Sequence, residues 1–367
     1  MSVEIWPAIA PDQLKVEEDA TQARELTWLL DAIHDTLRTL KSSLEETYAL
    51  LAPIDPGATL VVSTPKHETV KGYVTRVGTR LVKGSVALKL RTQPALTLHL
   101  DPARPIHIPE LTTLNTLLTQ SVDILTFVVS ESFARGPGHA DPRFVSSQLR
   151  LLAEYLAEAS SLLKGPELPI ADQNTPFLRH AAALRPVVLD DVLLLDVLPP
   201  DTTWTHSSVP PACFAPPLNP AHLSVHLTIQ DASLVLYLRA LEPADAPVNF
   251  GTKLALAIGT ARRLEHDEAD RIFGYCPEGA DDPIATEGSV LQRTRSGVGA
   301  SAGARGGGMG KGRGTETQVY VREKVRVVSA DPSLLSLSSK LGALGNALAL
   351  ARRNLAIVMG ETDEGGE

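Results

Sequence analysis

Leucine and other apolar residues recur at alternating steps of three and four along four stretches of the sequence, and this repeat constrains the fold more than any other feature. Between residues 17 and 51 the repeat is carried by Leu26, Leu30, Ile33, Leu37, Leu40, Leu44 and Leu51. Thr47 occupies the one polar position. A sustained heptad pattern of this kind predicts an α-helix with one apolar seam.

Two further helices are predicted between residues 109 and 165. Pro109 suits the first helical turn of one, and Asp141 followed by Pro142 supplies an N-cap and first turn for the other. The first of these seams consists of Leu111, Leu114, Leu118, Leu125 and Val128. The second consists of Val145, Leu149, Leu152, Leu156, Ala159 and Leu163.

A fourth seam lies near the C-terminus and begins after Asp331 and Pro332. It is carried by Leu334, Leu337, Leu341, Leu344, Leu348, Leu355 and Val358. A single helix is marginal in water, whereas full burial of each leucine contributes about 1.5–3 kcal/mol. We therefore expect an antiparallel four-helix bundle that unites the N- and C-terminal helices, built from residues 14–53, 109–165 and 331–360.

The first seam has a second interpretation, an intermolecular leucine zipper. A DNA-binding zipper needs a basic helix continuous with its seam, and the residues that precede Leu26 include the acidic run from Glu17 to Asp19. That variant is excluded, whereas a zipper between two copies of the chain stays open.

Elsewhere the apolar period changes to two, which predicts half-buried β-strands. The clearest case is the pair of runs Leu223 to Gln230 and Leu234 to Leu238, which predicts a hairpin. We expect an antiparallel β domain inserted between the helices, made of residues 57–108, 221–258 and 317–329. The predicted fold class is therefore α+β.

Two segments lack either period. Residues 166–220 are rich in proline and are expected to form a long extended connection with a few anchoring contacts. Residues 288–316 are dominated by glycine, serine, alanine and arginine, and are expected to be a disordered loop.

Composition narrows the function classes. The net charge of −9 gives no basic footprint for a nucleic-acid partner. The only two cysteines, Cys213 and Cys276, indicate neither a disulfide framework nor a metal site, and favour a reducing compartment. The most apolar run, residues 187–198, contains three aspartates, whereas a membrane span needs roughly 20 mostly apolar residues. Any membrane contact is therefore expected to be peripheral, without direct insertion.

Several short motifs resemble catalytic signatures but lack the context that the chemistry needs. Ser301 lies in a Gly-x-Ser-x-Gly pattern without the flanking strand and helix of a nucleophile elbow. Lys311 lies in an incomplete phosphate-binding loop. The acidic run from Asp267 to Asp270 is interpreted as a solvated turn. His222 and His226 are roughly 13 Å apart along a strand, too far for one metal ion.

No catalytic, cofactor-binding or metal-binding residue is therefore assigned. The expectation is a chain that is not an enzyme and uses no cofactor. Hydrolysis through Ser301 is kept as a minor alternative.

Three ordered segments carry a family resemblance. They are Glu25 to Leu30 at the start of the heptad helix, Val70 to Gly72 before the strand ending at Lys89, and Phe214 to Pro216 before the hairpin that ends at Leu241 to Pro243. Together with the strand at 319–328 and the terminal leucine helix, they resemble the Rogdi family, the leucine-zipper-containing subunit of the RAVE complex. The longer stretches 165–211 and 260–314 resemble insertions of fungal members.

The resemblance implies a non-catalytic subunit that works with a large propeller-containing RAVE subunit. It also implies direct or indirect contact with catalytic-sector subunits of the vacuolar proton-pumping ATPase. Together with its partner, the implied subunit promotes assembly of this pump by rejoining its catalytic and membrane sectors. The implied location is the cytoplasm, with peripheral recruitment to vacuolar or endosomal membranes. The alternative is a self-associating leucine-zipper scaffold unrelated to the pump.

Overall fold

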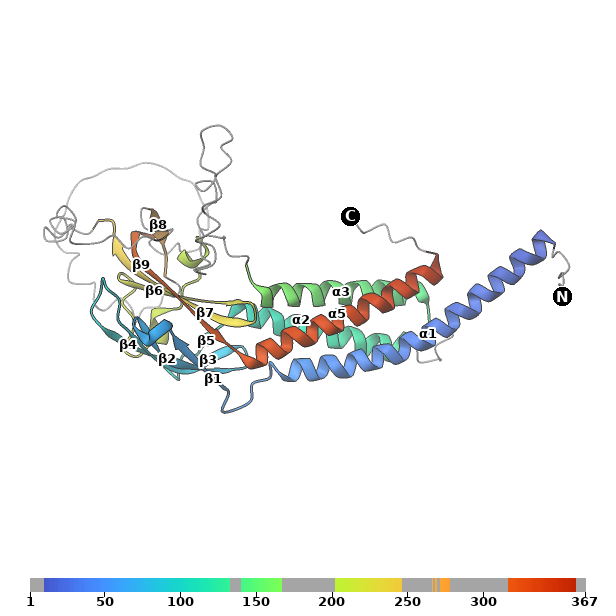
Figure 1. The fold of residues 1–367 in the computed structure, drawn as a ribbon, viewed down its shortest axis with the longest axis horizontal. Coiled ribbons are helices and arrows are strands. Elements are labelled where there is room, and N and C mark those ends of the chain that lie inside the picture. The colour runs from blue at the N-terminus through green and yellow to red at the C-terminus, as the bar shows by residue number, and fades with distance from the viewer. Residues whose placement is uncertain are drawn as a thin grey trace, which may run out of the picture.

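The computed structural model describes residues 10–132, 140–166, 202–245, 266, 268, 271–277 and 316–360. Helices occupy one end of an elongated molecule and antiparallel sheets occupy the other (Figure 1). This mixture confirms the predicted α+β class. Residues 288–315 of the loop predicted at 288–316 lie outside the described residues, as do Ser301, Lys311 and the apolar run 187–198.

The helical half contains four long helices within the described part of the chain. They are α1 (Pro11–Ala49), α2 (Pro109–Phe127), α3 (Pro142–Lys164) and α5 (Pro332–Met359), and a π-helical turn, η2 (Val128–Ser132), extends α2. Both α1 and α3 pack against α2 and α5. Neighbouring helices run in opposite directions (Figure 1). The first and last helices of the chain therefore lie side by side.

The seam residues of all four helices face the interior. Leu30, Ile33, Leu37, Leu40, Leu44, Leu334, Leu337, Leu341, Leu344 and Leu348 are buried, and Leu26 is half-buried. Thr47, the polar member of the α1 seam, is also buried and donates its hydroxyl to the Ser43 carbonyl at 2.7 Å. This local bond satisfies the hydroxyl without a partner on another helix.

The first sheet has the order β1-β2-β3-β4, and β5 also pairs with β3. The strands are β1 (Ala58–Ser63), β2 (Val70–Val77), β3 (Arg80–Leu88), β4 (Leu96–His99) and β5 (Ile106–His107). A short 3-10 turn, η1 (Pro65–His67), joins β1 to β2. All pairs are antiparallel.

The second sheet has the order β6-β7-β9-β8. Its strands are β6 (Leu223–Gln230), β7 (Ser233–Pro243), β8 (Ile272–Tyr275) and β9 (Thr317–Ala330). Gln230 pairs with Ser233, which confirms the predicted hairpin. Asp231 and Ala232 at its tip have φ values of 47° and 52°, as a type I′ turn requires.

Residues 202–220, the last part of the connection expected at 166–220, contact the sheets, whereas residues 167–201 lie outside the described residues. The segment 202–220 contains the 3-10 turns η7 (Thr203–Thr205) and η8 (Pro211–Cys213). The Val209 amide donates to the Val225 carbonyl at 2.7 Å, and the Ala215 amide donates to the His99 carbonyl at 2.8 Å. The segment therefore bonds to both sheets. Apolar residues between its prolines, including Trp204 and Phe214, are buried, and their burial explains why the segment packs against the sheets.

One contiguous core of buried side chains runs from the helical seams into both sheets. A second, smaller cluster lies between η7 and the second sheet and consists of Trp204, Leu241, Phe273, Tyr275, Val319 and Val321.

The tip of the β6–β7 hairpin connects the second sheet to the helices. Its Asp231 and Ala232 amides donate to the carbonyls of Lys164 and Leu163, at 3.0 and 2.8 Å, so the turn caps the last carbonyls of α3. Gly165 ends this helix with a φ of +73°, and a Cβ there would lie 2.2 Å from the Ile229 carbonyl oxygen. Only glycine fits this junction.

Candidate partner-binding surfaces

The predicted chemical motifs do not assemble into a reactive centre in the described residues. No group of three or more His, Cys, Asp or Glu side chains in this part of the chain is arranged to hold a metal ion. His226 is buried, its Nδ1 lies 3.1 Å from the Ser207 carbonyl oxygen, and its ring centroid lies 6.2 Å from that of Tyr237. Its surroundings are those of a side chain packed against the sheet.

The acidic run at 267–270 was expected to be solvated, and for Glu268 this expectation is wrong. Glu268 is buried and its two carboxylate oxygens accept hydrogen bonds from Arg239, at 2.8 Å from Nε and 3.0 Å from Nη2. Lys324 Nζ lies 3.0 Å from the same carboxylate. A buried carboxylate is stable only when it is paired, and here two cations from β7 and β9 supply the pairing.

Aromatic rings surround this buried charge cluster. The Arg239 guanidinium lies 4.6 Å from the Trp204 ring centroid and 5.2 Å from that of Tyr237. The nearby Tyr275 hydroxyl lies 3.1 Å from Ser208 Oγ. Burial raises the pKa of Tyr275 above 10.0, and the hydrogen bond with Ser208 opposes this rise. The cluster connects η7, β7, β8 and β9, and its role in the fold is structural.

A second buried ion pair joins the helical half to the first sheet. Arg76 of β2 donates from Nε to Asp331 Oδ2 at 2.6 Å, and both side chains are buried. The other Asp331 oxygen accepts from the amides of Ser333 and Leu334, at 2.9 and 3.4 Å, and so caps α5. Asp331 was predicted as the opening signal of this helix, whereas its partner Arg76 had no sequence signal beyond a charge in an apolar strand.

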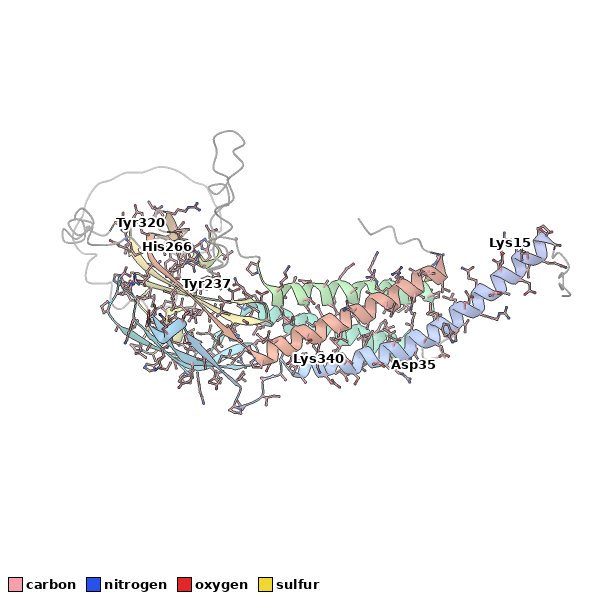
Figure 2. All side chains as sticks on the ribbon, viewed as in Figure 1. Lys15, Asp35, Tyr237, His266, Tyr320 and Lys340 are labelled. Carbon is pink, nitrogen blue, oxygen red and sulfur yellow. The ribbon has the colours of Figure 1, made fainter. Side chains whose placement is uncertain are left out.

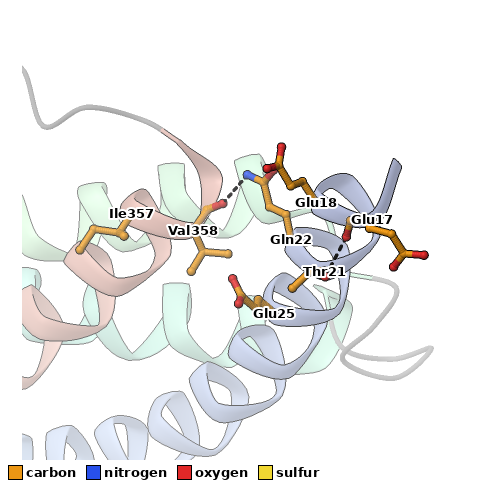
Figure 3. A pocket seen from close by; sticks show the side chains of 7 residues that line it. All are labelled: Glu17, Glu18, Thr21, Gln22, Glu25, Ile357 and Val358. Carbon is orange, nitrogen blue, oxygen red and sulfur yellow. Dashed lines mark hydrogen bonds between the residues drawn. The ribbon is translucent and has the colours of Figure 1, made fainter. Parts of the chain in front are cut away.

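An open groove lies where the first turns of α1 meet the last turn of α5 (Figure 3). Its volume is about 480 Å³. It is lined by Glu17, Glu18, Thr21, Gln22 and Glu25 from α1 and by Ile357 and Val358 from α5. Gln22 Nε2 donates to the Val358 carbonyl at 3.0 Å and holds the two helices together.

From this groove toward its N-terminus, α1 projects beyond the ends of the other helices (Figure 1). In Figure 2, Lys15 marks this projecting end, at the opposite end of the molecule from Tyr237 and His266. Side chains from Pro11 to Glu25 are all exposed. Large apolar side chains are exposed on α1 and α5 as well: Trp28 is 73% exposed, Ile357 65% and Leu350 62%. Neither the groove nor this overhang was predicted.

The first sheet offers a surface of the opposite charge. The strands β1 to β4 contain no aspartate or glutamate. Lys71 and Lys83 are exposed on them, and Tyr73 between them is 49% exposed. The molecule therefore presents an acidic groove at one end and a basic sheet at the other.

Among the described residues, α5 is the one helix whose length and composition would suffice to cross a membrane. Its seam leucines are nevertheless buried against α1 and α3. Core helices pass the same test of length and composition, so this property is weak evidence for a membrane span.

Comparison with known proteins gives one family. Residues 25–356 match the family model described as Rogdi leucine zipper containing protein. The match extends from α1 to the last turns of α5 and includes both sheets. A search of curated proteins gives no match.

Proposed function

Because the chain belongs to the Rogdi leucine zipper family, we propose that it is a non-catalytic adaptor of a RAVE-type complex, in a fungal member of the family. In this role it promotes assembly of the vacuolar proton-pumping ATPase by helping to rejoin the catalytic and membrane sectors. It acts without a cofactor, in the cytoplasm, and is recruited peripherally to vacuolar or endosomal membranes.

The observation that carries the proposal is the burial of the leucine seams within one chain. We infer that α1, α2, α3 and α5 form an antiparallel four-helix bundle, because each packs against two of the others and their seam leucines are buried. A seam that is filled by its own chain is not free to act as an intermolecular zipper. Partners then bind the outer surfaces, as expected of an adaptor.

The partners in this proposal are a large propeller-containing RAVE subunit and, directly or through it, catalytic-sector subunits of the pump. The acidic groove and the basic first sheet lie at opposite ends of the molecule, which supports simultaneous contact with two partners of opposite charge. Nucleic acid is not among the proposed partners.

The competing function is a self-associating zipper scaffold unrelated to the pump. The overhang of α1 is the feature that favours it, because its side chains are not covered by the other helices. Since the seam between Leu30 and Leu51 is buried within the chain, a homotypic zipper would be restricted to the first turns of α1.

Affinity purification of the tagged protein from its native cells, analysed by mass spectrometry, tests the proposal. The adaptor role predicts recovery of a large propeller protein together with catalytic-sector subunits of the pump, in amounts that change on sugar starvation. Recovery of this protein alone would contradict the adaptor role and favour the scaffold.

A further inference from the structure

We propose that the groove between the N-terminal turns of α1 and the C-terminal turn of α5 is a docking site for a basic amphipathic helix of a partner protein. The groove is defined by the seven lining residues shown in Figure 3. The inference concerns the chemistry of this groove and is independent of the assignment to pump assembly.

The negative charge of the groove favours a positively charged occupant. Glu17, Glu18 and Glu25 line it, and no lysine or arginine is among its seven lining residues. The carbonyl end of α5 adds negative potential, because a helix C-terminus carries about half a negative charge. Val358, whose carbonyl belongs to this end, lies in the groove wall. Lysine or arginine side chains complement this surface.

Exposed apolar side chains lie beside the carboxylates, and a small free cation would leave them uncovered. Trp28 lies seven residues after Thr21, on the same face of α1, and Ile357 projects from α5 into the groove lining. Both are largely exposed. Helices that dock in grooves present apolar anchors every three or four residues with polar flanks. A basic amphipathic helix supplies both kinds of contact at once.

The overhang itself is a helix without cover. No side chain between Pro11 and Glu25 is buried, and an isolated helix of this length is marginal in water. Docking of a second helix along this stretch would stabilise it. We therefore expect binding to increase the protection of these amides from hydrogen exchange.

Two other occupants fit the charge poorly. The overhang from Pro11 to Glu25 carries five carboxylates against Lys15 and Arg24, so pairing with the same overhang of a second copy would bring like charges together. An anionic membrane would be repelled for the same reason.

The test uses the full chain and two labelled synthetic peptides. Both peptides place leucine at helical three- and four-residue spacing; one carries lysine on its flanks and its twin carries glutamate. Binding is measured by fluorescence anisotropy at low salt, and tryptophan emission is recorded in parallel. We expect the lysine peptide to bind and to shift the emission of the protein to shorter wavelength, because Trp28 becomes covered. The glutamate twin should do neither.

Protein variants locate the binding. The triple variant Glu17→Lys, Glu18→Lys and Glu25→Lys should bind the lysine peptide at least ~10-fold more weakly. The matched control, Asp31→Lys with Asp35→Lys and Glu45→Lys, changes the net charge equally at exposed positions of α1 outside the groove, and should change binding by less than about twofold at moderate salt. In Trp28→Phe the emission shift should vanish although Trp6 and Trp204 remain.

Several results would overturn the inference. Binding of both peptides alike, of neither peptide, or an equal loss in the two triple variants would show that the groove does not select a basic helix. So would an emission shift that survives in Trp28→Phe. Light scattering that shows a dimer abolished by the groove variant would assign the groove to a second copy instead. None of these results depends on recovery of pump subunits, so the two proposals fail separately.

Discussion

The helical half and the sheet half of this molecule are stabilised by different means. The helices bury repeated leucines, and the one polar seam residue, Thr47, is satisfied by its own helix. The sheets bury charges, with Arg76 paired to Asp331 and Arg239 and Lys324 paired to Glu268. An apolar seam depends on many similar contacts, whereas a buried charge depends on one or two specific partners. The two halves should therefore respond differently to single substitutions.

The largest effect is expected where a charge enters the seam. Leu37 is fully buried in α1, and Leu37→Asp should lower the free energy of unfolding by about 4 kcal/mol or more, because an unpaired carboxylate would be buried. Urea unfolding followed by circular dichroism measures this change. Thr39→Asp, two residues away and exposed, is the matched control and should be nearly neutral. If the Leu37 variant proved as stable as this control, the seam would not be the core of the helical half.

Removal of an isolated ion-pair partner should have the next largest effect. Arg76→Met leaves Asp331 buried without its cation and should cost about 3–5 kcal/mol. Adding Asp331→Asn in the same chain should restore roughly 2 kcal/mol, because asparagine still caps α5 and no lone charge remains. Denaturant midpoints of the two variants test the pair. A double variant less stable than Arg76→Met would contradict the account.

A charge with two partners should tolerate the loss of one. Lys324→Met leaves Glu268 with both hydrogen bonds from Arg239, so we expect a loss of about 1 kcal/mol. The exposed pair of Lys340 and Glu46 gives the comparison, since Lys340→Met should cost less than about 0.5 kcal/mol. If Lys324→Met were as destabilising as Arg76→Met, a carboxylate with two cationic partners would tolerate the loss of one no better than a carboxylate with a single partner, which would contradict the account.

The smallest effect concerns Tyr275 at alkaline pH. Burial raises its pKa in the folded state above 10.0, so the folded protein keeps a proton that the unfolded chain has released. This contribution is fully present below pH 10 and is lost as the pH rises through the folded-state pKa. Tyr275→Phe should therefore lose less stability than the parent protein between pH 9 and pH 11. Parallel pH dependences for the two proteins would refute this.

Periodic features of the fold could be predicted from the sequence, because they repeat. The leucines from Leu30 to Leu44 mark α1, and alternation from Leu223 to Leu238 marks the β6–β7 hairpin. The strand β8, from Ile272 to Tyr275, has only four residues and no flanking alternation, so no periodic signal predicts it. The family was also recognisable, because its ordered motifs extend over both chain ends.

Features that depend on long-range proximity could not be predicted. Arg76 and Asp331 are 255 residues apart in sequence, and the groove brings Gln22 to a carbonyl 336 residues away. Glu268 lies in a run of acidic residues that is typical of a solvated turn, and only the cations of β7 and β9 explain its burial. The exposure of Trp28 likewise depends on where the other helices end.

The central claim is that α1 and α5 of the same chain pack together and leave only their outer surfaces to partners. Lys340 Nζ lies 3.1 Å from Glu46 Oε2 across this interface, and both side chains are accessible. A zero-length carbodiimide crosslink, applied to a mixture of unlabelled and nitrogen-15-labelled protein that has been refolded together, therefore tests the claim directly. The account predicts Lys340–Glu46 crosslinked peptides that are either wholly unlabelled or wholly labelled. Crosslinked products that join one labelled peptide to one unlabelled peptide would show that the seam is formed between chains and would contradict the account.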